Sequence, residues 1–100
     1  MFKEKAKQHA IKEAPKESCG IVVKDVYYAC NNISDTPEDN FAIHPKDFLK
    51  ARSKGKLQYI VHSHPEGGDA SELDKKACTA TKIPWYVYLL PEDTWQIINP

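Results

Sequence analysis

The alternation of hydrophobic and polar positions divides the first half of the chain into short segments. Between residues 2 and 14, apolar side chains recur on one stripe among Lys and Glu, which predicts a helix ending at Pro15. The runs CGIVV and VYYAC are rich in β-branched and aromatic residues, and Lys24 and Asp25 between them predict a hairpin. The run FAI, at 41–43, predicts a further brief strand.

The second half of the chain alternates strand-like and helix-like segments. A helix is expected to begin after Pro45 and to end at Gly55, where glycine favours termination. The run LQYIVHSH predicts a strand at 57–64, and residues 71–82 predict a helix. The runs WYVYLL and TWQIIN predict two final strands. The order α-β-β-(β)-α-β-α-β-β predicts an α+β fold, a mixed sheet flanked by helices.

Composition and charge narrow the class of protein. A length of 100 residues without repeat or linker predicts a single domain, 1–100. The formal net charge is zero and no basic cluster is present, which argues against nucleic acid as a partner. No stretch approaches the roughly 20 apolar residues that span a bilayer, and MFKEKAKQHA lacks the apolar core of a secretory signal. We therefore expect a cytoplasmic protein that contacts no membrane.

The three cysteines agree with a reducing compartment. Their number is odd and no C-x-x-C pair occurs, so Cys19, Cys30 and Cys78 are expected to be small buried apolar residues. The predicted hairpin places Cys19 opposite Cys30, but a disulfide there is not expected in a cytoplasm. A cysteine hydrolase using Cys19 with His62 is disfavoured, because Cys19 begins an apolar strand with no neighbouring cation.

Two of the four histidines lie close together at the end of a predicted strand. Side chains at positions i and i+2 of a strand point to the same face, so His62 and His64 project from one side of the sheet. Neutral imidazoles in this arrangement can bind a divalent cation such as Zn²⁺. The alternative interpretation is a buried, hydrogen-bonded His62 followed by a loop residue, His64.

The helix that follows carries a second set of polar residues. Ser71 and Asp74 have the spacing of a capping box, which alone explains both residues. A carboxylate in the first turn also stays ionised near the positive end of the helix dipole, as a metal ligand must. Gly67 and Gly68 allow the chain to turn back toward the strand end. Two histidines and one aspartate would leave the fourth position of a zinc site open, which is typical of a catalytic centre.

A catalytic zinc site also needs a general base. Glu17 directly precedes the apolar run SCGIVV, and from there it can lean toward the strand that carries His62. Taken alone, a solitary glutamate at this position is more readily explained as a solvated surface acid.

These motifs together resemble one known family. The segments PKESCGIVV, HSHP and SELD resemble the JAMM or MPN+ (JAB domain) zinc metalloproteases. The resemblance is strongest to the phage tail branch, the N-terminal domains of lambda-like tail assembly proteins, and extends to FAIHPKDF and PWYVYLL. The H-E-x-x-H motif of other zinc enzymes is absent. The spacer between Pro65 and Ser71 is EGGDA, one residue shorter than usual in the family, so its glycines must absorb the difference.

The resemblance implies a function and a role for each residue. His62, His64 and Asp74 would hold Zn²⁺, Glu17 would act as the general base, and Ser71 would hydrogen-bond the oxyanion or the water. The implied activity is hydrolysis of a peptide or isopeptide bond, with a peptidoglycan-like peptide or a tail protein as substrate and phage tail proteins as partners. The insertions that grip ubiquitin in other relatives are absent. A non-catalytic MPN-like scaffold in tail assembly is the alternative.

Overall fold

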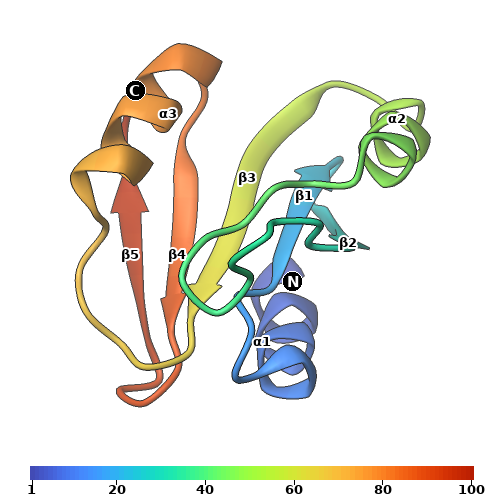
Figure 1. Cartoon of the computed structure of the whole chain (residues 1–100). Helices are drawn as coiled ribbons and strands as arrows, with labels where there is room; N and C mark the ends of the chain where they lie inside the picture. The colour runs from blue at the N-terminus through green and yellow to red at the C-terminus, as the bar shows by residue number, and fades with distance from the viewer.

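The computed structural model describes residues 1–100 and is built on one five-stranded sheet with three helices (Figure 1). The strand order is β2-β1-β3-β4-β5; β3 and β4 are parallel and all other neighbours are antiparallel. The predicted α+β fold with a mixed sheet is therefore confirmed. The elements are α1 (Phe2–Glu13), β1 (Cys19–Val23), β2 (Val26–Cys30), α2 (Pro45–Arg52), β3 (Leu57–His64), α3 (Glu72–Thr81), β4 (Trp85–Leu89) and β5 (Thr94–Ile98).

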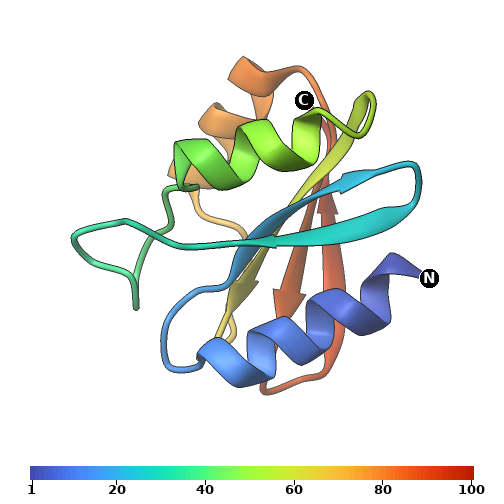
Figure 2. The ribbon, with the colours of Figure 1, turned by 90° about the vertical axis from the view of Figure 1, so that its right-hand side faces the viewer.

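The helices cover both faces of the sheet. Helix α1 lies on one face, whereas α2 and α3 lie on the other (Figure 2). Side chains of β3 alternate between the two faces of the sheet, and each face has its own hydrophobic core. On one face, Val61 packs with Phe2 and Ala6 of α1. Its neighbour Ile60 packs on the opposite side with Ala51 of α2 and with residues of α3 and β4. His62 has the same parity as Ile60 and therefore lies on the α2 and α3 side of the sheet.

The crossover between the two parallel strands positions the candidate site. Parallel neighbours cannot be joined by a tight turn, and the chain between β3 and β4 instead contains α3. The loop 65–70 leaves the C-terminal end of β3 and leads directly into α3. The first turn of α3 is thereby returned to the strand end that carries His62 and His64.

Two predicted elements differ in detail from the structure. The run at 41–43 forms no strand, only an isolated bridge between Asn32 and Ile43. The ladder stops there because Pro45 follows and starts α2, whose helical backbone takes the chain away from the edge. Helix α2 ends at Arg52, earlier than the predicted Gly55, and a turn at 53–55 connects it to β3. No helix combines the length and apolar character that crossing a membrane requires.

Candidate metal centre

His62 is completely buried and has no hydrogen-bond partner. Its side chain is 0% exposed, and neither Nδ1 nor Nε2 makes a hydrogen bond within the chain. Phe41 stacks against the ring, with centroids 4.5 Å apart. Burial lowers the pKa of His62, so the imidazole is held neutral. A buried polar atom without a partner is costly, and a neutral ring nitrogen facing acidic neighbours is suited to bind a cation.

His64 is held in one orientation by the loop that follows it. Its Nδ1 lies 2.8 Å from the carbonyl oxygen of Gly68, to which the ring donates a hydrogen bond. That contact leaves Nε2 available, in the way that metal-binding histidines are usually oriented. Gly67 and Gly68 have φ values of 82° and 88°, a region that residues with a Cβ rarely adopt. The two glycines thus make the turn that the short EGGDA spacer requires.

Asp74 points its carboxylate at both imidazoles. Its Oδ2 lies 3.4 Å from Nε2 of His62 and 3.2 Å from Nε2 of His64. Burial acts to raise the pKa of Asp74, but the two adjacent imidazoles outweigh it and hold the pKa well below its ordinary range. The same carboxylate raises the pKa of His64. Both shifts arise from the attraction between the Asp74 carboxylate and the imidazoles that it faces.

The two separations from Asp74 fit a zinc ion, and Glu17 shares with both histidines the spacing of a possible metal site. In a tetrahedral site with bonds of about 2.0–2.1 Å, neighbouring ligand atoms lie about 3.3–3.4 Å apart. The distances from Asp74 Oδ2 to the two Nε2 atoms, 3.4 and 3.2 Å, agree with that geometry. The donor set of two imidazoles and one carboxylate is one that zinc accepts, and the unpartnered Nε2 of His62 would gain a ligand bond.

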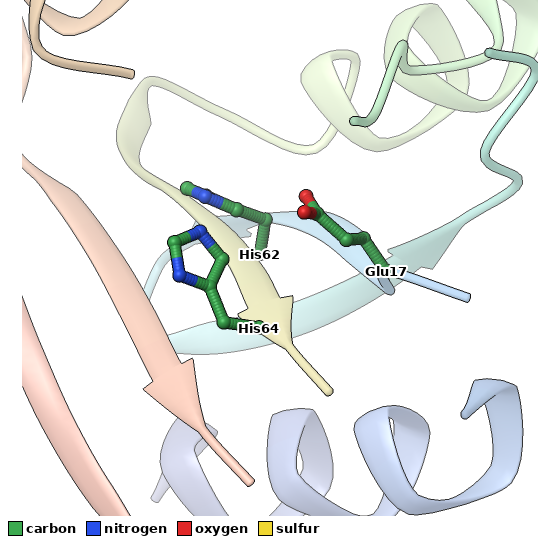
Figure 3. A group of neighbouring side chains, drawn as sticks. All are labelled: Glu17, His62 and His64. Carbon is green, nitrogen blue, oxygen red and sulfur yellow. The ribbon is translucent and has the colours of Figure 1, made fainter. Parts of the chain in front are cut away.

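Glu17 is buried beside the two histidines, so its interpretation as a surface acid is wrong. The residue is only 6% exposed, and one ligand atom from each of Glu17, His62 and His64 lies within 4.8 Å of the others. Figure 3 shows the carboxylate extending from the segment before β1 toward the side of β3 that carries both imidazoles. Its backbone is held by Pro37 and Asn32. Burial raises the pKa of Glu17 to about 7, a value suited to proton transfer near neutral pH.

Ser71 caps α3 at the rim of the same pocket. Its Oγ accepts a hydrogen bond from the backbone N–H of Asp74, and the Asp74 carboxylate accepts one from the N–H of Ser71. The capping box and the predicted site are therefore the same residues, and neither interpretation excludes the other. The Ser71 hydroxyl hydrogen is not used by the cap, because Oγ acts there as the acceptor. It remains available to donate to a bound molecule.

The pocket over these residues has a volume of about 270 Å³ and a strongly acidic lining. Sequence reasoning missed four acids of this lining, because they belong to no motif and reach the site from two loops. The only basic residue of the lining is His64, and the four further acids are Glu38, Asp39, Glu66 and Asp69.

Cys19 is not arranged as a nucleophile, although it is the cross-strand neighbour of His62. The thiol is 0% exposed, and its Sγ lies 3.7 Å from the carbonyl oxygen of Cys30, to which it donates. Burial raises the pKa of Cys19 to about 12, so the thiolate is scarcely populated at neutral pH. Cys19, Cys30 and Cys78 are all buried free thiols, as predicted.

Comparison with known proteins identifies the family. A family model described as prokaryotic homologs of the JAB domain matches residues 3–98. The chain belongs to this family. The resemblance seen in the sequence motifs is thereby confirmed, and the paired histidines at the end of β3 lie within a JAB domain.

Two similar proteins extend the comparison. Tail tip assembly protein K of Escherichia phage N15 is 39% identical to this JAB-domain chain over 97 residues, covering 92% of the chain. The chain spans only about two fifths of that relative, 40% of its length. The solution structure of protein DSY2949 from Desulfitobacterium hafniense matches with a TM-score of 0.75 at 23% identity, covering 96% of this chain and 76% of that one. This second likeness supports the fold.

Proposed function

We propose that this JAB domain is a zinc-dependent hydrolase of peptide or isopeptide bonds that acts as part of a phage tail. The observation that carries the proposal is the convergence of His62, His64 and Asp74 at ligand distances, with one imidazole buried and unpartnered. Glu17 beside them supports an enzyme rather than a metal site that only stabilises the fold. The similarity to a tail tip assembly protein supports the phage tail as the setting.

Each residue has a distinct task in this proposal. His62, His64 and Asp74 would hold Zn²⁺, which when bound supplies Lewis acidity toward water and toward a peptide carbonyl. Glu17 accepts the proton of the attacking water and delivers it to the leaving amine, a cycle favoured by its pKa of about 7. Ser71 donates its hydroxyl hydrogen to the oxygen that becomes negatively charged as the carbonyl is attacked.

The proposed substrates are a peptide of the cell wall or a protein of the tail. Both are consistent with a small acidic pocket of about 270 Å³ over the candidate metal centre. The proposed location is the host cytoplasm during assembly or the tail of the virion. Tail proteins are the proposed partners, by analogy with the relative from phage N15.

The decisive experiment compares the parent with Glu17→Gln after loading with zinc. Hydrolysis is followed on a panel of branched peptides, cross-linked peptides and peptidoglycan fragments, and zinc is measured by elemental analysis. Gln keeps the size of the side chain but cannot accept the proton, so we expect full zinc content and a loss of about 10²- to 10⁴-fold in rate. Glu13→Gln, on the opposite face of the sheet, is the matched control and should retain full activity.

The other outcomes of this experiment each contradict the proposal in a different way. If Glu17→Gln loses zinc, Glu17 is a ligand rather than the base. If it is as active as the parent, Glu17 has no role in proton transfer. If the zinc-loaded parent cleaves no member of the panel, the domain is a non-catalytic MPN-like scaffold of tail assembly.

A further inference from the structure

A second and larger groove lies away from the metal centre, along the edge strand β2. Figure 2 shows β2 facing the viewer between α2 and α1, with no strand of the sheet in front of it. The groove has a volume of about 480 Å³. Its floor is formed by Tyr27, Tyr28 and Ala29, and its walls contain Lys5 and His9 from α1 and Lys50 and Lys54 from α2 and the turn after it.

The backbone of β2 leaves hydrogen-bonding groups open toward this groove. The hairpin pairs Val23 with Val26 across a two-residue turn, so alternate residues of β2 direct their N–H and C=O groups at β1. The intervening residues, Tyr27 and Ala29, direct theirs outward. None of the hydrogen bonds outside the regular elements uses the backbone of either residue.

Further along the same edge, the segment 42–44 of the chain already pairs with residues 31 and 33. Beyond β2, the outward N–H of Ile33 donates to Ala42, and the outward carbonyl oxygen of Asn31 accepts from His44. The N–H of Asn31 donates to the carboxylate of Asp47, 2.8 Å away. The outward groups at 31 and 33 are thus satisfied by the chain itself, whereas those of Ala29, an exposed residue next in line, are free for another strand. Tyr27 is only 1% exposed, so its outward groups are covered rather than open.

The charges around the open edge are predominantly positive, although the whole chain is neutral. Lys5 approaches from the α1 side of the sheet, and Lys50 and Lys54 approach from the α2 side. The ion pairs formed by lysines of this chain involve Lys7 and Lys75 and none of these three. The one acid of the groove, Asp47, already accepts hydrogen bonds from Asn31.

We propose that the outer edge of β2 binds an extended acidic segment of another polypeptide, which adds a sixth strand to the sheet. Ala29 supplies the exposed backbone hydrogen bonds. Because side chains of a strand alternate between faces, consecutive acids in the added segment would meet Lys5 on one face and Lys50 or Lys54 on the other. The edge strand VYYAC carries neither lysine nor proline, the residues that usually protect an open edge from pairing. A second copy of this chain is disfavoured, because its lysines would repel these.

The experiment uses a labelled sample of the chain and a defined peptide. An acetylated and amidated peptide of Glu, Val and Thr, with Glu at consecutive positions, is titrated into ¹⁵N-labelled protein and followed by amide chemical shifts. We expect saturable shifts centred on Ala29 and its neighbours in β2, with slowed hydrogen exchange of the Ala29 amide. The same peptide with every Glu replaced by Lys should produce none of these changes.

Two pairs of variants test the charges and the backbone separately. Lys50→Glu with Lys54→Glu should weaken binding about tenfold or more, whereas Lys76→Glu with Lys82→Glu, which changes the net charge equally, should not. Ala29→Pro removes one outward N–H and should weaken binding; Ala29→Ser keeps that N–H and should bind as the parent does.

Three results would overturn the proposal. They are shifts that spare the β2 amides at saturating peptide, equal binding of the Lys peptide, and dimerisation of the chain through β2 in sedimentation experiments.

Discussion

At the scale of single residues, Asp74 does two things with one carboxylate. It accepts the hydrogen bond that closes the capping box, and it faces the imidazoles of His62 and His64. Both follow from its place in the first turn of α3, where the helix dipole also favours a negative charge. The two functions can be separated, because only metal binding depends on the full charge.

We expect Asp74→Ala to weaken zinc binding by more than about 100-fold, since two neutral imidazoles remain and even outer partners of a ligand contribute up to that amount. The measurement is a competition titration against a chromophoric chelator. Asp74→Asn is the control for the helix, because its amide oxygen can still accept from Ser71. Stoichiometric zinc held as tightly by Asp74→Ala as by the parent would leave capping as the only role of this residue.

The thiol of Cys19 provides a test of reactivity in the native fold. Because burial raises its pKa to about 12, roughly one thiol in ten thousand is ionised at pH 8, and the side chain is also inaccessible. The thiolate fraction grows only as pH rises toward that pKa. We expect iodoacetamide to leave Cys19 unmodified at pH 8 in native protein and to modify it fully in denaturant, as judged by mass spectrometry. Rapid labelling of native Cys19 would restore the cysteine hydrolase interpretation.

At the scale of elements, the start of α3 links stability to the site. The N-cap of this helix is Ser71, and the turn that it caps holds Asp74 in place. The preceding loop reaches this position only through the positive φ angles of Gly67 and Gly68. Substitutions at the N-cap should therefore lower the stability of α3 first and affect metal binding second.

Ser71→Ala should lower the free energy of unfolding by about 1 kcal/mol, because the N–H of Asp74 loses its acceptor. Urea denaturation measures this loss. Ser71→Thr keeps a hydroxyl at the N-cap and should be close to the parent. If Ser71 also acts in catalysis, Ser71→Ala should lose hydrolytic activity while retaining zinc. Unchanged hydrolysis in a folded Ser71→Ala variant would restrict this residue to capping.

At the scale of the whole molecule, the charges of a neutral chain are separated between two surfaces. Acids from two loops surround the metal centre, and lysines from two helices and an adjoining turn surround the edge of β2. Each surface therefore favours a partner of opposite charge, although the net charge of zero indicates neither.

If the proposed hydrolase is correct, its substrates should carry positive charge near the cleaved bond. Peptides with an amine-bearing side chain there should be cleaved several-fold faster than the same peptides with Glu, and the advantage should shrink as salt screens the acids. Glu66→Gln with Asp69→Asn, both on the rim, should reduce the preference without removing zinc. Equal rates for both peptides at low salt would show that the acidic lining does not select substrate.

Much of this protein could be predicted from local patterns in the sequence. The strand at 57–64 appears with the predicted bounds because its apolar run and its flanking breakers act over a few residues. The same locality places His62 and His64 on one face and makes Ser71 the cap of α3, since strand alternation and capping need no distant partner.

Tertiary structure decided everything that depended on segments meeting. The strand order β2-β1-β3-β4-β5 puts Glu17 beside β3 and buries it, which changes a seemingly ordinary acid into one with a pKa of about 7. The crossover through α3 brings Asp74 to the histidines, and two loops place Glu38, Asp39, Glu66 and Asp69 around the same pocket. Desolvation and charge proximity depend on distances in space. The sequence therefore determined which groups were available, and only the packed fold determined which of them lie together.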